Sequence, residues 1–143
     1  MPAIPPPAGD AVLPPADLFA IHDLMARYGN VIDERRWAGF ADVFTADCHY
    51  DASDFGMPVW HSLQELTDGM RASDAHPVAH QATNVVVGAP EADGSVRVLS
   101  KGLGVGVKGR VGSAVYEDIA VRTDDGCRLA SRIATLRRPE SRA

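Results

Sequence analysis

The sequence of 143 residues lacks three features that would assign it to a broad class of proteins. It has only two cysteines, Cys48 and Cys127, without metal-site spacing, and a domain of this length builds its core without disulfides. No segment approaches the ~20 apolar residues of a membrane span, and the N-terminus has no signal-peptide pattern. We therefore expect one soluble, cytoplasmic domain that does not interact with membranes.

An excess of basic residues is also missing. The 14 Lys and Arg face 19 Asp and Glu, which gives a formal net charge of −5, and the basic residues are scattered apart from Arg137, Arg138 and Arg142. Because nucleic-acid binding requires a basic patch or stripe, we expect no nucleic-acid partner. His22, His61 and His76 have no second ligand at helix spacing, so we expect no metal site.

Proline is concentrated at the N-terminus, where it makes up six of the first fifteen residues. This composition cannot form a helix or a strand ladder, so residues 1–15 are predicted to be a disordered arm. Residues 139–143 are predicted to be a frayed tail. The folded domain is therefore expected over residues 16–138.

The first half of the domain has helical periodicity. Apolar residues recur every three or four positions between Leu18 and Ile32, which predicts a helix over 17–31, begun by Asp17 and ended by Asn30. A second, shorter helix is predicted from Trp37 to Phe44, followed by a short strand in TADCHYDAS. A Ser-x-x-Glu capping box, formed by residues 62 and 65, predicts a third helix over 63–72.

From residue 78 onward the pattern is that of strands. VAHQATNVVVG, SVRVLSKGLGVGV, SAVYEDIAVRT and CRLASRIATLRR are separated by turn signals at 89–94, 109–112 and 124–126. Short turns between consecutive strands indicate an antiparallel meander. Glycines at 102, 104 and 106 predict a bend or bulge. Helices followed by strands predict an α+β fold, with the helices covering one face of a curved sheet.

Several polar residues lie among apolar neighbours, where a buried site would place titratable groups. Asp33 and His80 could form a general acid and base pair, because a carboxylate fixes the tautomer of an imidazole. The alternatives are an ordinary turn residue for Asp33 and a core histidine for His80. Asn84 shares a strand face with His80, and it either orients the histidine, bonds to backbone or contacts a substrate.

Other residues complete the candidate site. Tyr28 either packs in the core or points into a pocket. Five helical residues separate it from Asp33, which places the two side chains about 140° apart around the helix axis, so both reach one cavity only if the helix ends before Asp33. We expect Tyr50 to point inward and His49 outward. Arg132 either faces the pocket, where it could bind a carboxylate or oxyanion, or is a surface residue paired with Asp118 or Glu117; the residues alone favour pairing.

The order of these elements resembles the SnoaL-like branch of the nuclear transport factor 2-like (NTF2-like) superfamily. The similarity lies in IHDLMARYGNVIDERRWAGFADVFTADCHYD, HPVAHQATN and YEDIAVRTDDGCRLASR, and covers about residues 16–138. It implies a cone-shaped α+β fold, in which N-terminal helices pack on a strongly curved antiparallel sheet with a mixed edge and enclose a pocket. Many relatives carry tryptophan at the position of Cys127, and scytalone dehydratases use a second strand histidine that is missing here. The site pattern is closer to bile-acid 7-alpha-dehydratase.

The resemblance implies a lyase (dehydratase) or proton-shifting isomerase that needs no cofactor and acts on a hydrophobic, carbonyl-bearing polycyclic, steroid-like or polyketide-like molecule. Asp33, His80 and Tyr28 would be catalytic, while Tyr50, Asn84, Arg132 and Trp37 would contact substrate. The alternatives are a non-catalytic binding or dimerisation domain, and a polyketide cyclase or epoxide hydrolase-type enzyme, which would need a second carboxylate such as Asp51, Asp54 or Asp118. The resemblance also implies a homodimer.

Overall fold

The structure is a computed structural model, and it describes residues 2–6 and 12–138. Its helical elements are α1 (Pro15–Asp33), the short 3₁₀ turns η1 (Trp37–Asp42) and η2 (Ser53–Phe55), and α2 (Leu63–Ala72). Its strands are β1 (Phe44–Asp51), β2 (Val59–Trp60), β3 (Ala79–Pro90), β4 (Val96–Val105), β5 (Val111–Thr123) and β6 (Gly126–Leu136). The order, with most helical segments before the long strands, confirms the α+β prediction.

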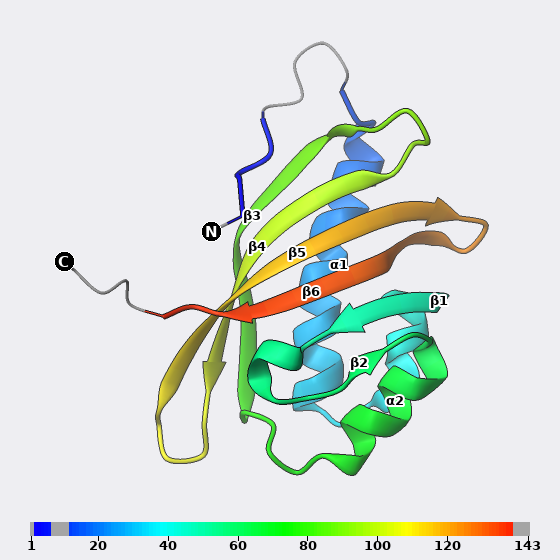
Figure 1. The fold of residues 1–143 in the computed structure, drawn as a ribbon. Helices are drawn as coiled ribbons and strands as arrows, with labels where there is room; N and C mark the ends of the chain where they lie inside the picture. Colours follow the sequence, from blue (N-terminus) through cyan, green and yellow to red (C-terminus); the bar gives the residue numbers. More distant parts are fainter. Residues whose placement is uncertain (1, 7–11, 139–143) are drawn as a thin grey trace, which may run out of the picture.

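The strands form one mixed sheet in the order β2-β1-β6-β5-β4-β3. The four long strands make the predicted antiparallel meander, while β1 pairs in parallel with β6 and antiparallel with β2. The long strands bend strongly, and α1 crosses the concave side of the sheet (Figure 1). This arrangement confirms the predicted NTF2-like cone with a mixed edge.

The sheet has several register shifts, and the one nearest the predicted bulge lies in β3 rather than at the glycines of β4. The register between β3 and β4 shifts between Thr83 and Val86, where Asn84 has a left-handed backbone with φ of 52°. β4 pairs with β5 without a shift, so no bulge occurs at its glycines. Asparagine tolerates this conformation better than most residues, which explains its place at the irregularity.

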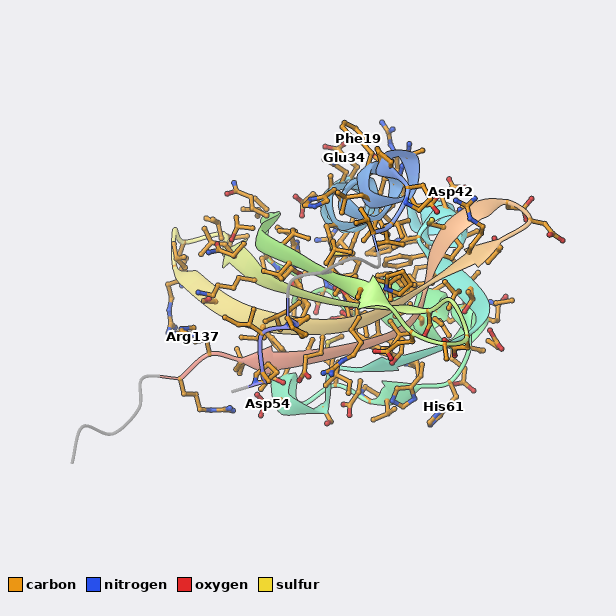
Figure 2. The ribbon with its side chains drawn as sticks, turned by 90° about the horizontal axis from the view of Figure 1, so that it is seen from above. Phe19, Glu34, Asp42, Asp54, His61 and Arg137 are labelled. Atoms are coloured by element: carbon orange, nitrogen blue, oxygen red, sulfur yellow. The ribbon has the colours of Figure 1, made fainter. Side chains whose placement is uncertain are left out.

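Helix α1 is longer than the apolar pattern predicts. It starts at Pro15, whose fixed φ suits the first helical turn, while Asp17 lies within that turn and forms an ion pair with Arg122. The prediction that Asn30 ends the helix is wrong: its side-chain amide donates to the carbonyl of Ala26, and the helix continues to Asp33. The helix buries an apolar stripe against the sheet, and Phe19 and Glu34 point away from it (Figure 2).

Of the two other predicted helices, one is confirmed and one is a shorter 3₁₀ turn. The third helix is confirmed: the Ser62 hydroxyl accepts the Glu65 N–H at 3.1 Å, and the Glu65 carboxylate accepts the His61 N–H at 2.8 Å. The second predicted helix is a 3₁₀ turn, since the chain enters β1 at Phe44.

The terminal predictions fall mostly on residues 1, 7–11 and 139–143, which lie outside the described residues. Of the predicted arm, residues 2–6 and 12–14 carry no helix or strand, and Pro5 is buried beside Gly88. No helix within residues 2–6 and 12–138 is long and apolar enough to cross a membrane.

Candidate active site

A cavity of about 430 Å³ lies between the concave side of the sheet and the helical segments, and we call it the central cavity. This volume falls within the range of small-molecule pockets, roughly 300–1,000 Å³. Apolar side chains form much of its wall, among them Ile32, Phe55, Met57, Met70 and Leu136. Its polar lining side chains include Tyr28, Tyr50, Tyr116, His76, His80 and Arg110.

Asp33 and His80 meet at the edge of this cavity. His80 Nδ1 lies 2.7 Å from one Asp33 carboxylate oxygen, and the backbone N–H of His80 donates to the other at 2.9 Å. Because an ionised carboxylate only accepts hydrogen bonds, we assign the imidazole proton to Nδ1. Nε2 has no hydrogen-bond partner within the described part of the chain, so it remains available to a ligand.

Gly29 explains how α1 and β3 come close enough for this contact. A Cβ atom at residue 29 would lie 2.8 Å from the carbonyl oxygen of His80, closer than real Cβ contacts occur. Asp33 lies one turn further along α1, at its last residue. The close approach therefore holds the carboxylate beside the imidazole.

Tyr28 and Asp33 do not share the cavity wall. The helix does not end before Asp33, and Tyr28 lines the central cavity while Asp33 does not. Tyr28 thus contacts the cavity directly, whereas Asp33, on another side of the same helix, contacts it only through His80.

Three buried tyrosines form the inner end of the cavity. The hydroxyls of Tyr28 and Tyr50 are 2.5 Å apart, and the Tyr28 and Tyr116 rings meet edge to face with centroids 5.8 Å apart. Burial raises the pKa of all three phenols above their usual value. The phenols are therefore neutral at physiological pH. In the Tyr28–Tyr50 pair, one hydroxyl donates a hydrogen bond to the other. The accepting hydroxyl keeps its own proton, which it can donate to a ligand.

Arg132 lies behind this tyrosine group. Its side chain is fully buried and makes two hydrogen bonds to Asp118, at 2.7 and 2.8 Å. Its guanidinium carbon lies 4.1 Å from the ring centroids of both Tyr28 and Tyr116. Burial has the largest single effect on its pKa and lowers it, but the attraction and hydrogen bonds to Asp118, together with Tyr28 and Tyr50, raise the pKa overall. The predicted partner is correct and the predicted surface position is wrong.

The remaining predicted residues have different positions. Tyr50 lines the central cavity, whereas His49 does not and contacts the ring of His61. Trp37 packs beside His76, 5.5 Å between ring centroids, without lining the cavity. Asn84 is exposed at the β3 irregularity and lies outside the cavity wall.

Sequence reasoning missed Tyr116, His76 and Arg110 as cavity residues. Strand alternation could have identified Tyr116. It shares one face of β5 with Asp118, and Asp118 pairs in register with Arg132. His76 follows α2 in a loop, where no periodicity applies; its Nε2 lies 2.8 Å from the carbonyl oxygen of Met70. Arg110 precedes β5 in a turn.

Within residues 2–6 and 12–138, no three His, Cys, Asp or Glu side chains gather in a way that could hold a metal ion. The candidate machinery of the site consists of a hydrogen-bonded carboxylate and imidazole, two paired phenols and an apolar cavity. Such groups can move a proton and stabilise an oxyanion.

Known structures share this architecture. A candidate aromatic ring hydroxylase from Novosphingobium aromaticivorans is 28% identical, with a TM-score of 0.73 over 90% of this chain and 94% of that one. A candidate scytalone dehydratase from the same organism is 17% identical, with a TM-score of 0.71 over 90% and 91% of the two chains. A type 2 hexachlorocyclohexane dehydrochlorinase, LinA, is 20% identical, with a TM-score of 0.71 over 86% of each. No curated protein matches the sequence.

The family model described as the SnoaL-like domain matches residues 16–133. This match covers α1 except its first residue, strands β1 to β5 in full and most of β6. The chain therefore belongs to the SnoaL-like family of the NTF2-like superfamily.

Proposed function

We propose that this protein is a lyase or isomerase that removes the proton next to the carbonyl group of a hydrophobic small molecule. The observation that carries the proposal is the Asp33–His80 hydrogen bond beside the apolar central cavity. Side chains alone suffice for such proton transfer, so the proposed reaction needs no cofactor.

In the proposed reaction, His80 Nε2 takes the proton from the carbon next to the carbonyl, and the electrons of that C–H bond form an enolate. Asp33 stabilises the resulting imidazolium, and a hydroxyl of the Tyr28–Tyr50 pair donates to the enolate oxygen. In a dehydratase, the enolate expels the β-hydroxyl, which takes the proton from His80 and leaves as water. In an isomerase, His80 returns the proton to another carbon of the conjugated system.

Two rival functions have less support. For a non-catalytic binding or dimerisation domain we would expect Asp33 and His80 to bond to backbone away from any cavity. Asp33 accepts the backbone N–H of His80, but His80 lines the cavity and the two side chains bond each other. An epoxide hydrolase-type reaction needs two carboxylates in the pocket, and no described residue of the cavity wall is Asp or Glu. A polyketide cyclase would share the proton-abstraction step, so it remains within the proposal.

We propose a ligand class from the size and polarity of the cavity. A cavity of about 430 Å³ with mainly apolar walls suits polycyclic, steroid-like or polyketide-like ligands. We also propose a cytoplasmic location, which fits the two free, buried cysteines.

The test is hydrogen–deuterium exchange at the carbon next to the carbonyl of 2-tetralone in D₂O, followed by NMR. This probe needs only the first chemical step. His80→Ala should lower the enzyme-dependent exchange rate at least ~100-fold, the usual contribution of a general base. His22→Ala, which removes an exposed histidine of α1, is the matched control and should exchange at the wild-type rate. Equal rates in the wild type and His80→Ala would refute the proposal.

A further inference from the structure

The central cavity carries a single charged arginine at its outer end. Among the described residues of the cavity wall, Arg110 is the only Lys, Arg, Asp or Glu. Its backbone carbonyl accepts the Gly106 N–H in the β4–β5 turn, but its side chain has no hydrogen bond or ion pair to any residue that the structure describes. The Arg110 side chain is exposed at the mouth of the apolar cavity, where a guanidinium can bind the charged end of an anion that enters the cavity.

The strand geometry places this arginine in line with the tyrosine group. Arg110, directly before β5, and Gly112, Ala114 and Tyr116 within it are spaced two residues apart and line the cavity, as do Val111 and Ser113 between them. Six residues of extended strand cover at most about 20 Å, so the arginine and the inner tyrosine lie at opposite ends of an elongated space.

Glycine keeps this space open. A Cβ at residue 112 would meet no atom within 4 Å, and Gly104, its partner across the β4–β5 ladder, also lines the cavity. At this pair of glycines the wall between the arginine and the tyrosines therefore carries no side chain. A ligand can lie along it with its carbonyl at the tyrosines and its other end at Arg110.

We propose that the ligand of the central cavity is an amphiphilic anion whose carboxylate or phosphate oxygens bind the guanidinium of Arg110. This inference rests on the proposed function, since it specifies the substrate class of the same site. It makes Arg110 the residue that selects charged over neutral hydrophobic ligands.

Calorimetry with 4-(2-naphthyl)butanoate, its neutral methyl ester and 2-naphthyl phosphate tests the proposal. The wild type should bind an anionic probe about 10-fold more tightly than the ester, and Arg110→Ala should abolish this preference. Lys108→Ala, which removes an exposed cation of the same turn that does not line the cavity, should preserve it. The anion that binds more tightly identifies the preferred head group.

Gly112→Leu locates the probes, because its side chain would enter the cavity and should weaken acid and ester alike. Any of four results would overturn the inference. The wild type could bind acid and ester equally or bind no anionic probe, Arg110→Ala could keep the preference, or Gly112→Leu could bind the acid as the wild type does. Circular dichroism checks that each variant is folded. Calorimetry requires no turnover, so the two proposals can fail separately. Arg110-dependent binding without 2-tetralone exchange would contradict only the proposed function. Exchange of 2-tetralone without a preference for anions would contradict only this inference.

Discussion

At the scale of single residues, two hydrogen bonds that the Asp33 carboxylate accepts hold His80 in place. One fixes the backbone of β3 and the other fixes the imidazole ring. The second bond matters for chemistry, because it leaves Nε2 as the unprotonated nitrogen that can accept a proton. A carboxylate in this role also stabilises the imidazolium formed during reaction.

Asp33→Asn should therefore lower 2-tetralone exchange on the order of 100-fold. The amide cannot stabilise the imidazolium, and it can turn its NH₂ group toward Nδ1, which would favour the other tautomer. Nitrogen NMR of the ring should show the Nδ1-protonated tautomer in the wild type and a shift toward Nε2 protonation in the variant. An Nε2-protonated His80 in the wild type would contradict this assignment.

The chain contains three tyrosines, and all three are buried with pKa values raised by burial. We expect native protein to show no tyrosinate absorbance as the pH passes 10, the ordinary phenol pKa, whereas chain unfolded in urea should titrate there. Because the folded state keeps protons that the unfolded chain releases, the unfolding free energy should be intact below pH 10 and fall above it. A native tyrosine that titrates at pH 10 would contradict the burial of the hydroxyl pair.

At the scale of elements, the packing of α1 on β3 depends on Gly29. Intrinsic helix propensity alone predicts that alanine there stabilises α1 by roughly 1 kcal/mol. The added Cβ would instead press on the His80 carbonyl oxygen, a backbone atom within the sheet that cannot move alone. Overpacking of this kind costs typically 1–3 kcal/mol, so the contact should outweigh propensity.

Gly29→Ala should accordingly lower the free energy of unfolding, measured in urea, and slow 2-tetralone exchange by displacing His80 from Asp33. Gly112→Ala is the comparison variant, because its Cβ enters open space, and it should unfold near the wild-type urea concentration. A Gly29→Ala protein more stable than the wild type would show that β3 yields to the helix.

At the scale of the whole molecule, the outer face of the sheet bears on the predicted homodimer. The half-buried apolar side chains of Leu99 and Ile119 lie there with Ile133, which is 41% exposed. Light scattering should give the mass of a dimer at micromolar concentration, and Ile133→Glu should give a monomer because it places a charge within the contact. A wild-type monomer would refute the homodimer, and a dimer unaffected by Ile133→Glu would place the interface elsewhere.

The sequence by itself determined the order of elements and the type of fold. The helix stripe from Leu18 to Ile32, the capping box at Ser62 and the four β-rich stretches are local patterns, and local patterns are legible in one chain. It also drew attention to Asp33, His80 and Tyr28, since polar groups among apolar neighbours stand out.

Only the tertiary structure decided how these residues meet. The parallel pairing of β1 with β6, the two-residue β2 and the close approach of α1 to β3 at Gly29 depend on contacts between distant segments. The burial of Arg132 between two tyrosine rings and the exposure of Asn84 are likewise set by the curvature of the sheet and the irregularity in β3. Periodicity fixes which residues share a face, but the packing of elements against one another decides which face encloses the cavity.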